Sequence, residues 1–366
     1  MDLADPRVDA LIASCERGLK TLLQTEDADL FMVAANGHGV WEAVIANLAA
    51  PAQTVLVPGT GHFSEQWALQ AEALGVHVVR TPVRPGWPMD AAALEAALRA
   101  DMAHAVVAVF AVHTDTASGT TSDLQAVRRA LDAAGHPALL VVDVVASLAA
   151  VPFAMDALGA NVVLGASQKG LMVPPGLGFV AVDSRAMEVA RRNPAPRYYW
   201  DWTRRQSPLS YRKFCGTPPM NLLMGLEASL GLIFQEGLDG ADGVFARHRW
   251  LASAVQAAVD GWSEGGAVRL FVEDPLARSV SVTTVTVSEG VDPEALRTLA
   301  RERFQVAIAG GLGPQTGRAF RIGHLGDMNP AMILGCLGGL EAAMRVLGIP
   351  VGGGGVHAAI AVLAGR

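Results

Sequence analysis

Short apolar runs alternate with longer amphipathic stretches from about Leu30 to Val182. This alternation predicts an α/β domain with a mostly parallel, seven-stranded sheet and helices on both of its faces. Runs such as 106–110 are apolar at every position, as strands buried on both faces require. The predicted strands span 30–34, 54–57, 76–80, 105–112, 138–142, 162–165 and 178–182, and the predicted helices span 63–74, 91–99 and 123–134, the last with Ser122 as its N-cap.

The pattern changes after a segment rich in proline and tryptophan at 194–219, which leads into a long helical stretch. Beyond a glycine-rich run at 237–243, helical periods mix with one alternating strand, which predicts a smaller α+β domain. We therefore expect a large domain over 1–236 and a small C-terminal domain over 237–366. The remaining predicted elements are helices at 221–236, 244–259 and 293–303, a strand at 279–287, and a flexible glycine run at 352–355 before a last helix.

Composition narrows the range of functions. The 366 residues are 51% hydrophobic and 17% charged, so a sizeable core is available and disorder is excluded. The net charge of −7 offers little to nucleic acid or to an anionic membrane. Three widely spaced cysteines suggest neither a disulfide framework nor a metal-binding pair, and we see no signal peptide or membrane-length apolar run. We expect a cytoplasmic protein that contacts neither membrane nor nucleic acid.

Lysine is rare in this chain and occurs at only three positions, Lys20, Lys169 and Lys213. Lys20 falls on an amphipathic N-terminal helix and Lys213 beside Arg212, where both are expected to be solvated charges. Lys169 instead follows a predicted buried strand, in an apolar loop bounded by glycine and proline. Chemistry that needs an amine therefore points to Lys169, although an exposed loop lysine is the ordinary alternative.

A carboxylate follows another predicted strand. Asp143 ends the apolar run 139–143, and the carboxyl ends of parallel strands face the crevice where ligands bind in such sheets. Taken alone, Asp143 could equally be a solvent-facing strand end or a helix cap. Together with Lys169 it describes a pyridoxal-phosphate site, because the amine can form a Schiff base with the aldehyde and the carboxylate can pair with the pyridinium nitrogen.

A glycine-rich turn, Asn36-Gly37-His38-Gly39, lies between a predicted strand and a helix. Bare amides at a helix N-terminus suit a phosphate, and glycines let the chain approach it closely. A strand-to-helix connection without any ligand is an equal alternative. The dinucleotide fingerprint would need glycine at position 42, which is Glu42, so a nicotinamide cofactor is disfavoured.

Several longer motifs occur in order along nearly the whole chain. With them the chain resembles the class V, fold type I pyridoxal-phosphate aminotransferases, in particular the serine–glyoxylate and alanine–glyoxylate branch. The matching segments are N-G-H-G at 36–39, G-H-F-S-E-Q-W at 61–67, H-T-D-T-A-S-G at 113–119, V-V-D-V-V-A-S-L at 141–148, G-A-S-Q-K-G-L-M-V-P-P-G-L-G at 165–178, Y-W-D-W at 199–202, G-T-P-P-M-N at 216–221 and F-R-I-G-H-L-G-D at 320–327.

The resemblance implies pyridoxal 5'-phosphate as the cofactor and assigns its contacts. Lys169 would carry the Schiff base and shuttle the proton, and Asp143 would hold the pyridinium nitrogen. The remaining implied contacts are Phe63 against the ring, Thr116 near the ring oxygen, and the amides of Gly37, His38 and Gly39 with the Gln168 side chain on the phosphate.

Two further residues concern the substrate and the partner. Arg321 matches an arginine that grips the substrate α-carboxylate, since its planar fork bonds a carboxylate in two places. Thr217 matches a residue that reaches the phosphate from the neighbouring subunit, so the resemblance implies a homodimer with shared active sites. The alternatives are that Phe63 is a core residue, that His38 makes no side-chain contact, and that Arg321 caps the following helix. Trp200 and Trp202 are expected to pack at the subunit interface.

The chain also departs from the family pattern. Family members usually begin with a stretch containing Gly-Pro-Thr that packs across the dimer and touches the substrate, whereas this sequence starts Met1-Asp2-Leu3. We expect either a truncated start or a pocket that closes differently. Asn36 stands where relatives commonly carry serine, and an amide can still form a hydrogen bond there.

The predicted function is a transaminase that moves an amino group from a small L-amino acid, serine or alanine, to glyoxylate or a similar small 2-oxo acid. A lyase or racemase on the same scaffold is one alternative, and a non-catalytic pyridoxal-phosphate-binding protein is another. A cysteine desulfurase is less favoured, since Cys336 falls on a predicted buried helix.

Overall fold

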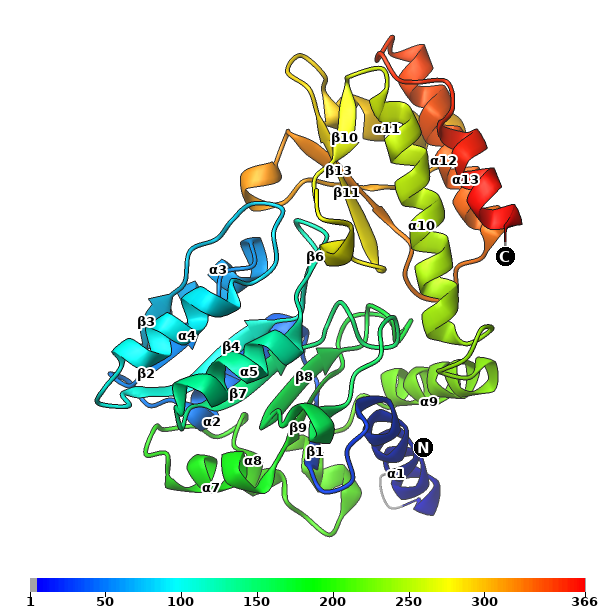
Figure 1. The fold of residues 1–366 in the computed structure, drawn as a ribbon. Coiled ribbons are helices and arrows are strands. Elements are labelled where there is room, and N and C mark those ends of the chain that lie inside the picture. The colour runs from blue at the N-terminus through cyan, green and yellow to red at the C-terminus, as the bar shows by residue number, and fades with distance from the viewer. Residues whose placement is uncertain (1–4, 366) are drawn as a thin grey trace. The chain divides into compact units, whose positions relative to one another are not determined.

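The computed structural model describes residues 5–365, apart from the side chain of Ser210. Contacts divide the chain into two compact units (Figure 1). The large unit comprises residues 1–84, 88–114 and 122–236, and the small unit comprises 85–87, 115–121 and 237–366. Within the described residues no helix is long and apolar enough to span a membrane.

A seven-stranded sheet forms the centre of the large unit, with strand order β1-β9-β8-β7-β4-β2-β3. All neighbouring pairs are parallel except those of β9, which runs antiparallel to both β1 and β8. The predicted mostly parallel seven-stranded sheet is therefore confirmed. Its strands are β1 (Asp29–Val33), β2 (Thr54–Val57), β3 (His77–Arg80), β4 (Val106–Val112), β7 (Leu139–Asp143), β8 (Val162–Ala166) and β9 (Gly178–Val182).

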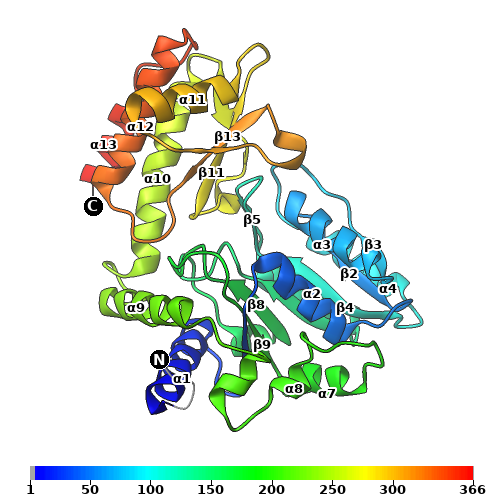
Figure 2. The same cartoon turned by 180° about the vertical axis from the view of Figure 1, so that it is seen from behind.

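Helices cover both faces of this sheet. Buried residues of α2, α3 and α7 form one core with the strands on one face, and α4 packs beside α5 on the other (Figures 1 and 2). Helix α1 pairs with α9. The helices are α1 (Pro6–Leu23), α2 (Gly37–Leu48), α3 (His62–Ala73), α4 (Ala91–Ala100), α5 (Leu124–Ala134), α6 (Met155–Leu158), α7 (Ser184–Arg192), α8 (Trp202–Arg205), the 3₁₀ turn η1 (Ser210–Phe214) and α9 (Met220–Glu236).

The small unit contains a four-stranded antiparallel sheet in the order β10-β11-β13-β12. Its core joins one face of that sheet to α10, α11, α12 and α13. A hairpin of β5 (Thr114–Asp115) and β6 (Thr120–Thr121) contributes residues 115–121 to this unit. The other elements are α10 (Val244–Ser263), β10 (Val268–Leu270), η2 (Pro275–Ala277), β11 (Val282–Val287), α11 (Pro293–Phe304), β12 (Ala309–Gly310), η3 (Gly313–Gln315), β13 (Ala319–Gly323), α12 (Pro330–Val346) and α13 (Gly355–Ala364).

One local prediction is wrong. The N-cap of α5 is Asp123, whose carboxylate accepts from the amides of Gln125 and Ala126, while the Ser122 hydroxyl accepts from the Met89 amide. In the glycine run at 352–355, Gly353 and Gly354 are exposed, whereas Gly352 and Gly355 are closely packed. A Cβ on Gly355 would lie 2.1 Å from Nε1 of Trp262, so glycine is required there by contact.

Candidate active site

Five loops of the large unit leave the sheet at one edge. Strand β1 is antiparallel to β9, which is antiparallel to β8, so β1 runs parallel to β8, β7, β4 and β2. The carboxyl ends of these strands therefore share an edge, where ligands bind in open α/β sheets. The segments that follow them carry Gly37, Phe63, His113, Asp143 and Lys169.

Asp143 is the last residue of β7 and is 5% exposed. Its two carboxylate oxygens accept different protein donors. The Val145 amide donates to Oδ1 at 2.7 Å, and the indole N–H of Trp41 donates to Oδ2 at 2.7 Å. Each oxygen has two lone pairs, so the carboxylate can accept further bonds. Asp143 is thus a buried acceptor fixed at the strand end, and neither a solvated strand end nor a helix cap.

Lys169 follows β8 in the neighbouring position of the sheet, where Asp143 pairs in register with Leu164. The loop from 167 to 177 is closed on itself by Ser167. Its hydroxyl donates to the Pro174 carbonyl at 2.7 Å, and its carbonyl accepts from the Val173 amide at 3.0 Å. The carboxylate therefore stands at the end of β7, and the amine stands on the braced loop that follows the adjacent parallel strand β8.

Gln168, beside the lysine, is half-buried. Within the described part of the chain its Oε1 atom is buried and has no hydrogen-bond partner. A buried amide oxygen without a partner is costly in a folded protein. Because the two ends of an amide can exchange places by rotation, this side chain can also present its donor to an anion at the same position.

The glycine-rich turn begins α2. Asn36 is the N-cap, and its side-chain oxygen accepts from the Gly39 amide at 3.1 Å. The amides of Gly37 and His38, at the first two positions of the helix, have no carbonyl one turn back to bond. Of the three amides predicted for the phosphate, the Gly39 amide already donates to Asn36. Gly39 also has a packing role, since a Cβ there would lie 2.9 Å from Cβ of Ala35.

Aromatic rings pack beside this turn. The indole of Trp41 is stacked on Trp67 with centroids 5.4 Å apart, and Phe63 meets Trp41 edge-on at 6.3 Å. Phe63 is half-buried at the margin of the core, not inside it. The ring of His38 packs 4.6 Å from that of Trp41, and whether its side chain contacts a ligand stays a prediction.

Two residues near Asp143 were missed from the sequence. Trp41 lies one helical turn after Gly37, and that spacing could have placed it on the sheet side of α2. His113 follows β4, and its ring Nδ1 lies 2.8 Å from the Ser147 hydroxyl. Burial lowers the pKa of His113 to about 4, so its ring is neutral at physiological pH.

Arg321 lies in β13 of the small unit. It stands between Phe320 and Ile322, which face the core, so its side chain points to the other face of the sheet. Its Nε donates to the Gly310 carbonyl and its Nη1 to the Thr116 carbonyl, both at 2.7 Å. Burial lowers the pKa of Arg321 from its ordinary value. The guanidinium is held by backbone oxygens of its own unit, and it does not cap a helix as the alternative proposed.

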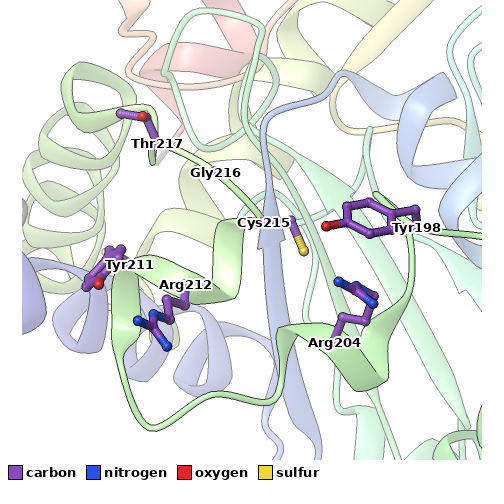
Figure 3. Close-up of a pocket in the computed structure, with 7 residues that line it drawn as sticks. All are labelled: Tyr198, Arg204, Tyr211, Arg212, Cys215, Gly216 and Thr217. Atoms are coloured by element: carbon purple, nitrogen blue, oxygen red, sulfur yellow. The ribbon is translucent and has the colours of Figure 1, made fainter.

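Thr116 and Thr217 lie in different settings. Thr116 is buried in the 115–121 hairpin of the small unit. Thr217 is exposed in the large unit and lines a cavity of about 680 Å³ (Figure 3). In that cavity the Arg204 guanidinium lies 4.0 Å from the ring centroid of Tyr198. The other lining residues are Tyr211, Arg212, Cys215 and Gly216.

The packing corrects the expectations for Lys213 and Trp202. Lys213 is not a solvated charge, because its amine bonds Glu16 at 2.7 Å and both side chains are largely covered. Trp202 is 1% exposed and stacks on Phe31 inside the large unit, so it is a core residue of the unit. Trp200 donates its indole N–H to Glu42 at 3.1 Å.

Comparison with known proteins gives one family. Residues 5–321 match the family model "Aminotransferase class-V". The chain is 39% identical to the L-aspartate–glyoxylate aminotransferase of Paracoccus denitrificans, covering 98% of this chain and 89% of that protein. It is 38% identical to the serine–glyoxylate aminotransferase of Methylorubrum extorquens, covering 94% of this chain and 85% of that protein.

A solved structure agrees with these relatives. The ureidoglycine–glyoxylate aminotransferase of Bacillus subtilis superposes with a TM-score of 0.90 at 26% identity, covering 100% of this chain and 92% of that chain. Sequence motifs, family model and fold therefore point the same way. The chain belongs to the class-V aminotransferases, fold type I enzymes whose cofactor is pyridoxal phosphate.

Proposed function

We propose that this aminotransferase moves an amino group from a small L-amino acid, serine or alanine, to glyoxylate or a similar small 2-oxo acid. Relatives at 39% and 38% identity are named for transfer to glyoxylate, which supports the acceptor. The observation that carries the proposal is the placement of Asp143 at the end of β7 and of Lys169 in the loop that follows β8, the adjacent parallel strand.

The residues at that edge fit pyridoxal phosphate. Asp143 places a carboxylate at the strand end, the type of acceptor that a protonated ring nitrogen requires. Gln168, whose buried Oε1 has no hydrogen-bond partner within the described residues, can turn its amide N–H toward a phosphate, and the amides of Gly37 and His38 supply further neutral donors. Phe63 lies half-buried beside Trp41 at the same edge, where the resemblance places an aromatic ring against the cofactor. We assign the cofactor contacts to Lys169, Asp143, Gly37, His38, Gly39, Phe63, Gln168, Thr116 and Thr217. The Gly39 amide already donates to Asn36, so its contact with the phosphate would come from other backbone atoms of Gly39.

When bound, the cofactor supplies an electron sink that makes the α-proton of an amino acid acidic. The chain's own groups then divide the remaining work. The Nζ of Lys169 would remove the α-proton and hold it for redelivery, as a positioned amine can. Asp143 keeps an anion beside the ring nitrogen. Arg321, oriented by two carbonyls, binds the substrate carboxylate.

We also propose that the working form is a cytoplasmic homodimer. Thr217 is exposed and lines the same cavity as Arg204 and Arg212, a setting that suits contact with an anionic group bound to a second copy. Three free cysteines are compatible with a reducing compartment. The large unit, ending at residue 236, is assigned as the cofactor-binding domain and the unit from 237 as the small C-terminal domain.

The test is a donor-by-acceptor panel on purified protein loaded with pyridoxal phosphate. Serine, alanine and aspartate are offered as donors, each with glyoxylate, pyruvate or no acceptor. Keto acid that forms only with an acceptor, together with glycine from glyoxylate, supports the proposal. Ammonia or a racemised amino acid without an acceptor would show a lyase or racemase instead.

A variant separates catalysis from simple cofactor binding. Lys169→Ala is expected to lose the visible absorbance of the bound aldehyde and at least about a thousandfold of turnover, since it removes both the covalent link and the base. Full multiple-turnover activity in this variant contradicts the mechanism. A desulfurase role for Cys336 is disfavoured, because burial raises the pKa of its thiol to about 11 and keeps it protonated at neutral pH.

A further inference from the structure

The hydrogen bond between Trp41 and Asp143 joins two buried side chains from different elements. Trp41 is 2% exposed on α2, and Asp143 is 5% exposed at the end of β7. Their heavy atoms are 2.7 Å apart, which is a short bond for an N–H donor on a carboxylate. A carboxylate at this depth depends on hydrogen-bond donors for its charged form, and the Trp41 indole is one of them.

The indole ring is held in place before it donates. One face of Trp41 stacks on Trp67 with an interplanar angle of 11°, and Trp67 stacks in turn on Phe110 at 4.6 Å. Because the rings are packed face to face, the indole plane cannot turn without breaking the column. The direction of its N–H is therefore fixed by packing.

Donors on both oxygens also fix the Asp143 carboxylate. The Val145 amide holds Oδ1 through the backbone of the following turn, and Trp41 holds Oδ2 from another helix. A carboxylate held at both oxygens cannot rotate freely about its χ2 angle. An indole donates only and does not titrate, so it stabilises the anion without adding a charge. The adjacent histidines, His113 and His38, both have pKa values lowered by burial.

We propose that Trp41 is a positioning residue for the cofactor: its indole N–H keeps the Asp143 carboxylate ionised and in one orientation before the pyridine nitrogen arrives. This inference rests on the proposed role of Asp143 and extends it to a residue that touches neither the substrate nor the reacting atoms. A purely structural tryptophan would contribute packing but would leave the affinity for the cofactor unchanged.

Trp67 provides the matched control. It is fully buried in the same ring column, yet within the described residues its indole N–H has no acceptor. Trp41→Phe and Trp67→Phe therefore make the same chemical change beside one another, and only the first removes a donor from Asp143. We expect Trp41→Phe to weaken pyridoxal-phosphate binding about tenfold, as loss of a bond to a charged group implies, and Trp67→Phe by less than about threefold.

A second measurement does not depend on folding of a Trp41 variant. The chain has seven tryptophans, so protein labelled with 15N-tryptophan gives seven indole signals. One signal should lie far downfield in the cofactor-free protein, move upfield in Asp143→Asn, and respond when pyridoxal phosphate is added to the wild type. No other indole is expected to follow both changes.

The outcomes separate this inference from the proposed function. If the wild type binds pyridoxal phosphate but Trp41→Phe and Trp67→Phe lose equal affinity, the positioning role is wrong and the proposed function stands. The same conclusion follows if Asp143→Asn leaves all seven indole signals in place. A wild type that takes up no pyridoxal phosphate overturns both.

Discussion

The two units of the chain present their candidate groups in different ways. In the large unit these groups follow strand ends, so the course of the sheet brings Asp143 and Lys169 to one edge. In the small unit Arg321 lies within a strand, and carbonyls of Gly310 and Thr116 hold its guanidinium. The first arrangement follows from topology, whereas the second depends on a particular side-chain geometry.

This difference indicates which property of each residue, its charge or its shape, a substitution must preserve. Groups at strand ends depend on neighbours that also hold them, as Trp41 holds Asp143. A guanidinium held by backbone oxygens does not depend on a partner side chain, but only its planar shape can reach both oxygens at once. Loss of charge should therefore be most damaging in the large unit, and loss of shape in the small unit.

The largest effect should come from removing the charge of Asp143. Asp143→Asn deletes the anion that we assign to the pyridinium nitrogen, and a pair of unit charges about 4 Å apart is worth about 4 kcal/mol at an effective dielectric near 20. We expect kcat/KM to fall about a thousandfold, measured with the best donor and glyoxylate. Asp156→Asn is the control, since Asp156 lies exposed on α6 and accepts from the Glu26 amide at the surface. Equal activity in the two variants would contradict the assignment of Asp143.

Acid should lower the unfolding free energy of both units, in each case through protonation of a buried histidine. Burial lowers the pKa of His113 in the large unit and of His324 in the small unit from 6.5 to about 4. The unfolded chain therefore binds protons first as the pH falls, so this stability is full above pH 6.5 and is lost towards pH 4. Each histidine should remove about 3 kcal/mol over that window. Hydrogen exchange in each unit at several pH values measures it.

A variant assigns the acid response to one unit. Nδ1 of His324 lies 2.8 Å from the Val280 carbonyl and so carries the proton, while Nε2 accepts from the Thr283 hydroxyl. His324→Asn can keep a donor for Val280 without a titrating ring. This variant should make the stability of the small unit less dependent on pH and leave the large unit unchanged. If the stability of the small unit still falls equally with pH, His324 is not the cause.

Arg321→Lys tests the importance of shape. Lysine keeps the charge but loses the planar fork and the bonds to Gly310 and Thr116. We expect kcat/KM to fall roughly thirtyfold through a raised KM, with affinity for pyridoxal phosphate changed by less than about twofold. Arg297→Lys, on α11 of the same unit, should change kcat/KM by less than about threefold. A loss shared by both variants would mean that the small unit, and not the fork, is responsible.

The smallest effect separates packing from ligand binding at the start of α2. A Cβ on Gly39 would meet Ala35 and approach the Trp200 ring at 3.3 Å, so Gly39→Ala should cost about 1 kcal/mol of unfolding free energy. Gly231→Ala on α9 meets nothing within 4 Å and should stabilise by about 0.5 kcal/mol. Chemical denaturation without cofactor measures both, and a neutral Gly39→Ala would leave the phosphate as the reason for glycine.

The sequence predicts most of the large unit because its signals are local. Buried runs mark the strands, and a lysine or aspartate directly after a strand marks the edge. The reversed direction of β9 was not specified, since an apolar run such as 178–182 reads the same in either orientation. Trp41 was missed because its partner lies on a distant strand, and indole–carboxylate pairs have no sequence spacing.

The small unit was harder to predict for a physical reason. Its short strands β10 and β12 are held by pairing with β11 and β13, and contain too few residues to show a period. The glycines at 352–355 illustrate the same limit, because close packing on Trp262 and chain flexibility use the same residue type. The role assigned to Arg321 came from its motif and stays a proposal, while its hydrogen-bond partners come from tertiary contacts.

The reversed strand β9 has a mechanical consequence for the lysine. A parallel successor to β8 would need a long crossover, usually a helix, whereas an antiparallel one needs only the braced connection 167–177. The loop that carries Lys169 is therefore short, and both of its ends continue into strands of the same sheet. The position of the amine is then set by the four methylene groups of the side chain, so a longer or shorter side chain at position 169 would misplace it.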